Sequence, residues 1–300
     1  MTAGLWHAFA KINLGLEVGG LRPDGYHEVR TVYQSIALAD LLEVRPASQG
    51  IAFTCEGEGA PPGEENLVVR AARSLQKAFS CKKGARIRLV KRIPVQAGLG
   101  GGSADAAVAL LALSRLWRLP ASPLELLPLA AALGSDVPFF LVGGTALGVG
   151  RGEEVYPLPD APSLEVVVAR SPRGTSTREA YGRLEGRLTP GNALFTLQGI
   201  VSGIVEGKVG EGLFFNRFEE VTGVPEGDAA ALAHAVSAVG GRLLLAGSGS
   251  AWLGLFTGRE QAQEALRRMA HRGSRGLATH TLTRKDYWER TVPSQEKESL

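Results

Sequence analysis

Apolar and polar residues alternate along the first segment of the chain, residues 6–18. The even positions from Trp6 to Val18 are apolar, and Lys11 and Asn13 lie among the odd positions. A period of two residues is typical of a strand with one buried face. The pattern predicts a strand with Lys11 and Asn13 on the same face, which for a lysine without further context is the solvated side of a sheet.

The rest of the chain mixes short apolar runs, which predict strands, with apolar residues at helical spacing, which predict amphipathic helices. Strands are expected at residues 41–44, 51–55, 85–93, 164–169, 242–246, 251–256 and 277–282. Helices are expected at 67–79, 104–113, 124–133, 193–206, 227–239 and 260–271, together with a short helix that carries Tyr181.

Strands and helices interleave in both halves, which predicts an α+β fold with mixed α/β layers. A chain of 300 residues is typical of two domains, and the glycine-rich stretch 143–152 lies near the expected seam. Residues 285–300 are charged and polar, so we expect a disordered tail there.

Glycines crowd the stretch between the expected strand 85–93 and the expected helix 104–113. Gly98, Gly100, Gly101 and Gly102 fall within five residues, and Ser103 follows as the expected helix cap. Such a stretch loses much backbone entropy on ordering unless it needs positive φ angles or close approach by another group. A glycine loop that opens onto a helix N-terminus exposes backbone amides at the positive end of the helix dipole. The stretch therefore predicts a phosphate site.

Composition and charge limit the classes of protein to which this chain can belong. The chain is 44% hydrophobic and 21% charged, with a net charge of +3, which is typical of a globular protein and does not require a nucleic-acid or membrane partner. Cys55 and Cys81 have neither disulfide-scaffold nor zinc-site spacing. With no signal-peptide pattern and no long apolar run, we expect a cytoplasmic protein, either a monomer or a weak homodimer.

Three further features have both an ordinary and a chemical interpretation. Tyr26 and His27 follow a Pro-Asp-Gly turn, where hairpin packing is the ordinary explanation. Asp136 lies between a helix stop and an apolar run, a common place for a turn or capping acid. The glycine loop itself matches neither the Walker A pattern, which requires a lysine after the glycines, nor the dinucleotide-binding fingerprint.

The loop does resemble that of the GHMP kinases, P-x-x-x-G-L-G-[SG]-[SG]-[SA]. The matching residues are Pro94, Val95, Gln96, Ala97, Gly98, Leu99, Gly100, Gly101, Gly102, Ser103 and Ala104. The resemblance extends to residues 10–14 in the first strand, to 134–138 and to the late Gly-Ser-Gly-Ser motif at 247–250. It implies a two-domain GHMP kinase fold: a ribosomal-protein-like, ATP-binding α/β domain at 1–156 and an α+β sandwich at 157–284.

The resemblance also implies roles for these residues. Lys11 and Asp136 match the catalytic pair, in which the aspartate orients or accepts the proton of the attacking hydroxyl. Residues 94–104 would bind the ATP phosphates, Asn66 would line the adenine side, and the Ser103 hydroxyl would reach a phosphate or Mg²⁺. ATP and Mg²⁺ are therefore the expected cofactors.

Further markers resemble one branch of the family, whose small-molecule substrate is a diphosphocytidyl methylerythritol in non-mevalonate isoprenoid precursor biosynthesis. These markers are the Lys-Ile-Asn-Leu and Pro-Asp-Gly-Tyr-His stretches, the Glu-Asn-Leu at 65–67 and the triple glycine. The resemblance implies phosphorylation of the 2-hydroxyl. The residues implied in substrate binding are Asn13, Tyr26, His27, Thr177 and Tyr181.

Two positions depart from the family pattern, and two other functions stay open. Gln96 stands where a small residue is expected, and Arg217 follows Asn216 where an acid is commoner. Another GHMP kinase, of the mevalonate or homoserine type, shares the loop but not the Pro-Asp-Gly-Tyr-His stretch. A non-catalytic RNA-contacting module is disfavoured by the near-neutral charge and by the presence of both Lys11 and Asp136.

Overall fold

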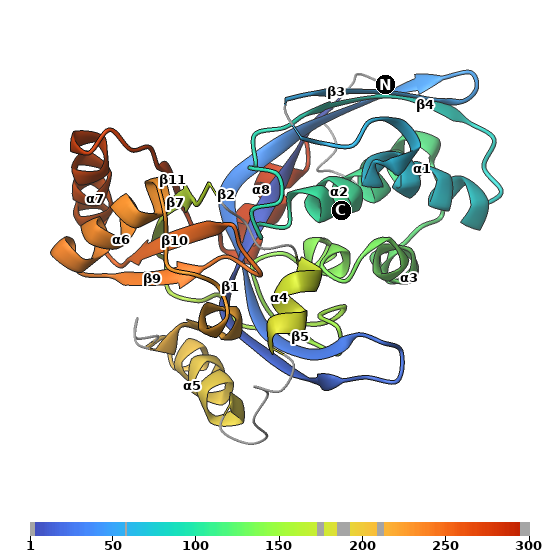
Figure 1. Ribbon diagram of the computed structural model, residues 1–300. Coiled ribbons are helices and arrows are strands. Elements are labelled where there is room, and N and C mark those ends of the chain that lie inside the picture. The colour runs from blue at the N-terminus through green and yellow to red at the C-terminus, as the bar shows by residue number, and fades with distance from the viewer. Residues whose placement is uncertain (1–3, 58, 173–176, 185–192, 209–212, 295–300) are drawn as a thin grey trace.

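The computed structural model describes residues 4–57, 59–172, 177–184, 193–208 and 213–294 (Figure 1). Two β-sheets lie back to back through a shared apolar core, and helices cover the outer side of each (Figure 1). The prediction of an α+β fold is confirmed.

The first sheet is built on one long antiparallel pair, β1 (Leu5–Leu21) and β2 (His27–Ala47). The sequence predicted a strand only at 41–44 within β2, because both faces of its middle are buried and the period of two is lost there. The order is β3-β4-β2-β1-β8, with β5 and β6 branching from β2. The added strands are β3 (Ile51–Glu56), β4 (Gly84–Val90), β5 (Thr145–Val149), β6 (Glu154–Pro157) and β8 (Phe215–Asn216).

The β1–β2 pairing is interrupted by shifts of register between Phe9 and Lys11 and between Asn13 and Gly15. Lys11 and Asn13 lie between these two irregularities, and Asn13 is directly opposite Tyr33. Bulges re-aim side chains and are frequent beside active sites. Contrary to the solvated face predicted from the alternation, both side chains are almost fully buried, at 4% and 2% exposure.

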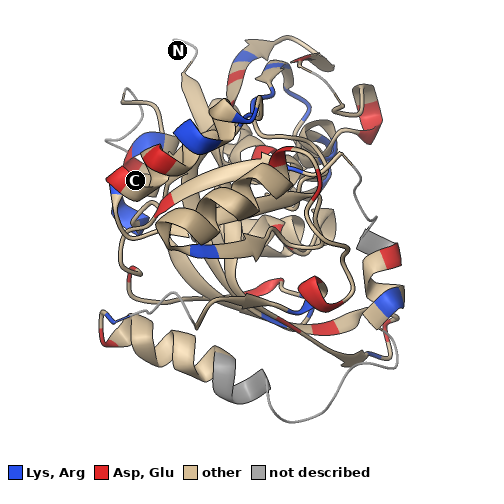
Figure 2. Cartoon of the chain, turned by 60° about the vertical axis from the view of Figure 1, so that its left-hand side comes forward, with Lys and Arg blue, Asp and Glu red and all other residues tan. Residues whose placement is uncertain are grey.

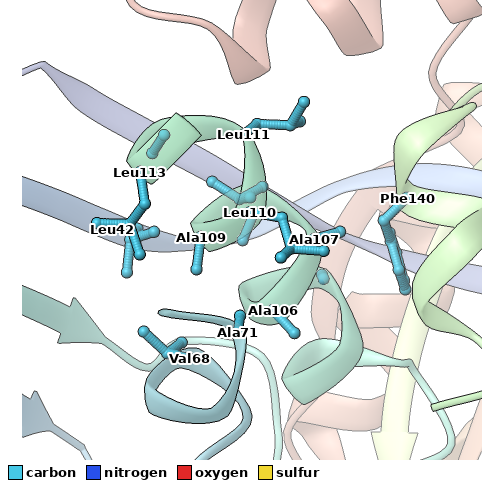
Figure 3. Close-up of a cluster of buried hydrophobic side chains, with 14 of the residues drawn as sticks. Leu42, Val68, Ala71, Ala106, Ala107, Ala109, Leu110, Leu111, Leu113 and Phe140 are labelled. Atoms are coloured by element: carbon cyan, nitrogen blue, oxygen red, sulfur yellow. The ribbon is translucent and has the colours of Figure 1, made fainter. Parts of the chain in front are cut away.

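Helices α1 (Leu67–Ala78) and α2 (Gly101–Trp117) pack on the first sheet, and α3 (Pro123–Leu133) packs on these two helices. Figure 3 shows α2 at the centre of their core, with Leu110 and Ala106 among apolar side chains from α1 and β2. Asn66 caps α1, since its Oδ1 accepts from the Val68 amide. The predicted start of α2 was wrong: the N-cap is Gly100 in the left-handed region, and Ser103 lies inside the first turn.

The second half forms an antiparallel sheet in the order β11-β7-β10-β9, on which α6 and α7 pack. Its strands are β7 (Glu165–Arg170), β9 (Arg242–Leu245), β10 (Ala251–Phe256) and β11 (Leu277–His280). The helices of this half are α4 (Thr177–Leu184), α5 (Ala193–Val205), α6 (Asp228–Val239) and α7 (Arg259–His271). The domain boundary expected at residues 156/157 falls at the last residue of β6, ahead of β7, and these two strands belong to different sheets. The boundary itself stays a prediction.

The C-terminal segment differs from the sequence prediction. Residues expected in a disordered tail form α8 (Arg284–Thr291), which packs on β1; residues 295–300 lie outside the described part. Tyr287 is fully buried and donates to the Phe140 carbonyl at 2.7 Å, and Trp288 Nε1 donates to the Val142 carbonyl at 3.1 Å. The prediction of a disordered tail was wrong because it rested on the polar composition of the segment. The short helix is held in place by its one buried edge, which carries Tyr287 and Trp288.

The charge distribution is mixed, as the composition indicated. Figure 2 shows Lys and Arg interspersed with Asp and Glu along the described elements. Among the residues that the structure describes, no helix is both long and apolar enough to cross a bilayer.

Candidate active site

A cavity of about 830 Å³ lies where β1, β2, the glycine loop and the second half of the chain meet. Its lining includes nine of the predicted site residues: Lys11, Asn13, Tyr26, His27, Gly98, Gly100, Ser103, Asp136 and Tyr181. A second cavity of about 280 Å³ contains Asn66 and residues 94–103. Gly98, Gly100 and Ser103 border both cavities, so the glycine loop forms the partition between them.

Lys11 and Asp136 face each other in the larger cavity, with Lys11 Nζ 3.4 Å from Asp136 Oδ2. Lys11 is almost fully buried, whereas the Asp136 side chain retains 34% exposure towards the cavity. Asp136 precedes a 3₁₀ helix, Val137–Leu141, whose apolar side chains are buried in the first core and fix its position. Its carboxylate makes no capping hydrogen bond, which argues against the ordinary capping interpretation.

Asn13 supports the lysine. Its Oδ1 accepts from Lys11 Nζ at 2.9 Å, and its Nδ2 donates to Thr31 Oγ1 at 2.7 Å. The Thr31 hydroxyl in turn donates to the Gly15 carbonyl at 2.7 Å. This buried chain fixes the amide of Asn13 and therefore the direction of the Lys11 ammonium.

Tyr33 is a cavity residue that the sequence analysis missed. Its hydroxyl donates to Asp136 Oδ1 at 2.9 Å, and Lys11 Nζ lies 5.5 Å from its ring centroid. Only the pairing of Asn13 with Tyr33 across β1 and β2 could have pointed to it, and that pairing requires knowledge of the register.

The glycine loop is held by backbone bonds on both sides. The Leu99 carbonyl accepts from the Lys11 amide at 3.0 Å, and the Ala97 carbonyl accepts from the Ala251 amide at 3.3 Å. Gly98, at φ +78°, lies against the turn 246–250, the late Gly-Ser-Gly-Ser motif. The first amides of α2 have no intrahelical acceptor, so they remain available to an anion at the helix N-terminus.

Gln96 adopts φ +56°, in the left-handed region, and its side chain is exposed. For a residue with a Cβ, this conformation costs about 1–2 kcal/mol in the folded state. Glycine avoids this cost, but part of the gain is lost because glycine has a larger conformational entropy in the unfolded chain. We therefore expect Gln96→Gly to raise the free energy of unfolding by about 0.5–1 kcal/mol in urea titrations. Gln96→Ala, which keeps the Cβ, is the matched control and should leave it unchanged; an equal gain in both variants would contradict the backbone explanation.

A buried ionic cluster that the sequence analysis also missed borders the smaller cavity. Lys91 Nζ contacts Asp40 and lies 2.7 Å from Asp105 Oδ2, and all three side chains are nearly inaccessible. Burial raises the pKa of Asp105 to about 8, against the opposing effect of Lys91. Asp40 also accepts from the Ile93 amide at 2.8 Å. The cluster therefore ties the segment that enters the glycine loop to Asp105, the third residue after the triple glycine.

Asn66 lines the smaller cavity, but its amide is already used locally. Its Oδ1 caps α1 through the Val68 amide at 3.0 Å, and its Nδ2 donates to the Pro61 carbonyl at 2.9 Å. An adenine contact by Asn66 stays a prediction.

Aromatic side chains form one end of the larger cavity, at His27, which pairs with Leu21, ten residues along β1 from the Lys11 that contacts the loop. His27 stacks on Tyr181 with centroids 5.0 Å apart, and Phe218 meets Tyr181 edge-on at 4.9 Å. His27 Nδ1 lies 3.1 Å from the Gly19 carbonyl, which assigns a proton to that nitrogen. Tyr26 is half exposed beneath the Arg151 guanidinium, a cavity cation that the sequence analysis did not single out. The side chain of Thr177 lies outside the described residues.

The larger cavity also offers hard oxygen donors. Across the described part of the chain, no three His, Cys, Asp or Glu residues form a cluster that could enclose a metal ion. Ser103 and Asp136 nevertheless line the cavity beside the loop. One or two such oxygens fit Mg²⁺, which usually binds through a substrate's phosphates, waters and few protein ligands.

Comparisons with known proteins agree with this geometry. Residues 66–144 match the family model described as "GHMP kinases N terminal domain". A protein of Pelotomaculum thermopropionicum named 4-diphosphocytidyl-2-C-methyl-D-erythritol kinase is 46% identical over 278 residues, which cover 91% of this chain and 96% of the relative. The chain belongs to the GHMP kinase family. It is an ATP-dependent kinase.

Solved structures support the fold of this GHMP kinase. A crystal structure of 4-(cytidine 5'-diphospho)-2C-methyl-D-erythritol kinase matches with a TM-score of 0.74 and 35% identity, over 92% of this chain and 98% of that one. A crystal structure of L. major mevalonate kinase in complex with R-mevalonate matches with a TM-score of 0.72 at 14% identity, over 94% of this chain and 96% of that one. The latter likeness shows the fold alone. The predicted GHMP kinase fold is confirmed.

Proposed function

We propose that this GHMP kinase transfers the γ-phosphoryl group of ATP to the 2-hydroxyl of 4-diphosphocytidyl-2-C-methyl-D-erythritol, in non-mevalonate isoprenoid precursor biosynthesis. The observation that carries the proposal is one cavity with two different ends. Lys11 and Asp136 lie beside the glycine loop, and His27, Tyr181 and Tyr26 lie at the other end. The names of the similar kinases point to the same substrate.

ATP would use both cavities. Its phosphates would lie against the amides of Gly101, Gly102 and Ser103, where helix α2 begins and no side chain blocks the first two positions. The base would enter the smaller cavity beside residues 94–97 and Asn66. The γ-phosphate would then reach the larger cavity past Gly100 and Ser103, which border both spaces.

In the transfer step, the oxygen of the 2-hydroxyl attacks the γ-phosphorus while the bond from that phosphorus to the β,γ-bridging oxygen breaks, which releases ADP. Asp136 orients the hydroxyl and accepts its proton. Lys11 offsets the negative charge that develops on the transferred group. Ser103 and Asp136 are the cavity oxygens that would help the ATP phosphates to hold Mg²⁺, which would neutralise phosphate charge.

The aromatic end would bind the cytidine. Cytosine offers a π-face for stacking on Tyr26 or Tyr181, and His27 can hydrogen-bond its polar edge because the Gly19 carbonyl fixes the imidazole. Burial raises the pKa of Tyr181 to about 12, so this ring stays a neutral phenol. We retain Thr177 and Asn13 as proposed substrate contacts.

A substrate panel tests the proposal. We expect phosphoryl transfer from ATP to the diphosphocytidyl alcohol, with kcat/KM at least about 10³-fold lower for mevalonate and for homoserine, because neither can occupy the aromatic end. Product formation is measured by phosphorus NMR or mass spectrometry, with a reaction lacking acceptor as the control for ATP hydrolysis. Comparable turnover of mevalonate or homoserine would favour the other GHMP kinase interpretation and overturn the assignment.

A further inference from the structure

Tyr33 contacts both members of the Lys11–Asp136 pair. Its hydroxyl is 2.9 Å from Asp136 Oδ1, and its ring face lies 5.5 Å from Lys11 Nζ. The Gly152 carbonyl, at 3.3 Å, is a longer second acceptor for the same hydroxyl. The shorter distance assigns the proton chiefly to the carboxylate.

The protein holds this ring rigidly. Tyr33 is 2% exposed and packs against Phe139, with centroids 4.8 Å apart, in the 3₁₀ helix that follows Asp136. Gly148 on β5 leaves room for the ring, since a Cβ there would lie 2.4 Å from Tyr33 Cε2. The hydroxyl therefore has little freedom to leave Asp136.

Tyr33 and Asn13 are directly opposite each other across β1 and β2. Asn13 holds the Lys11 ammonium, and Tyr33 holds the Asp136 carboxylate. One cross-strand pair thus supports both groups proposed to act in the transfer. A purely structural tyrosine would not need to direct its hydroxyl at the half-exposed carboxylate of the cavity.

We propose that Tyr33 is a positioning residue for phosphoryl transfer, whose hydroxyl holds one oxygen of Asp136 so that the other edge of the carboxylate faces Lys11 and the attacking alcohol. This proposal rests on the proposed role of Asp136. Burial raises the pKa of Tyr33 well above its ordinary value, so the residue remains a protonated donor and does not act as the base itself.

The test compares steady-state kinetics of the wild type and Tyr33→Phe, with whichever alcohol the wild type phosphorylates. Loss of a hydrogen bond to a charged group should lower kcat about 10–100-fold. KM for ATP and for the alcohol should stay within about twofold, because Tyr33 acts through Asp136. In an Asp136→Asn background, adding Tyr33→Phe should change kcat by no more than about twofold.

Tyr287→Phe is the matched control, since it also removes a buried hydroxyl that donates at 2.7 Å but outside the cavity. It should lower the melting temperature while kcat changes little. If Tyr33→Phe does not fold, Tyr33→Met fills the same space without a hydroxyl. It then takes the place of Tyr33→Phe, alone and combined with Asp136→Asn. The proposal is overturned if kcat is unchanged, if only KM rises, or if the two substitutions are additive. A wild type inactive on the diphosphocytidyl alcohol would overturn the proposed substrate, not the role of Tyr33.

Discussion

Asp136→Asn should lower kcat about 10³-fold and leave the KM for ATP nearly unchanged. The amide matches the carboxylate in shape but cannot accept the proton of the attacking hydroxyl, and general-base contributions of 10²–10⁴-fold are typical. It also leaves Lys11, which is almost fully buried, without the carboxylate 3.4 Å from its ammonium. Quenched-flow measurement of phosphoryl transfer at saturating ATP and acceptor checks the effect on the chemical step.

Asp286→Asn is the control for removal of a carboxylate. Asp286 is exposed in the first turn of α8, where its Oδ2 accepts from Thr283, and it does not line either cavity. This variant should keep wild-type kcat. Retention of more than about one tenth of wild-type kcat by Asp136→Asn would remove Asp136 from the role of base.

Gly98→Ala should cost about 2–5 kcal/mol of folding free energy and abolish measurable ATP binding. A Cβ on Gly98 would lie 1.9 Å from the Ala246 carbonyl oxygen, inside any contact distance, so the glycine loop or the turn 246–250 must move. The φ of +78° adds about 1–2 kcal/mol for any residue with a Cβ, and overpacking of this kind costs typically 1–3 kcal/mol. Denaturant titration and calorimetry with ATP measure the two effects.

Gly102→Ala is the matched control for stability in the same loop. A Cβ there would first meet Leu67 Cδ1, at an ordinary 3.7 Å, and Gly102 already lies in the first turn of α2. Its unfolding free energy should equal or exceed that of the wild type. Equal stability of both alanine variants would show that the turn 246–250 does not support the loop through Gly98.

For the glycine loop, the sequence predicted the local conformation but not the segment that packs against it. The density of glycines at 98–102 predicted close approach by another group, and the Gly-Ser-Gly-Ser motif at 247–250 was recognised as part of the family resemblance. That these two stretches approach each other depends on the packing of the two sheets, which no local pattern encodes. The predicted Ser103 cap was wrong because Gly100 reaches the left-handed region more easily and starts the helix earlier.

In the candidate active site, some residues were predicted from the sequence and others were found only in the structure. Lys11, Asp136, Tyr26 and His27 were found from family motifs, which are short and contiguous. Tyr33 carries no such motif, and its partner Asp136 lies 103 residues away. The sequence analysis missed the Asp40–Lys91–Asp105 cluster and α8 for the same reason. Each depends on contacts between residues 14 to 147 positions apart in the chain.

By itself, the sequence determined that this chain has mixed α/β layers, a phosphate loop before an apolar helix, and the motifs of a GHMP kinase. Periodicity, glycine conformation and capping act over a few residues, so they are legible without coordinates. Only the tertiary structure decided that Lys11 and Asn13 are buried, that Tyr33 holds Asp136, and that the C-terminal segment is a packed helix. Those outcomes follow from strand register and from the meeting of the two sheets, where burial and pairing free energies are summed over residues far apart in the chain.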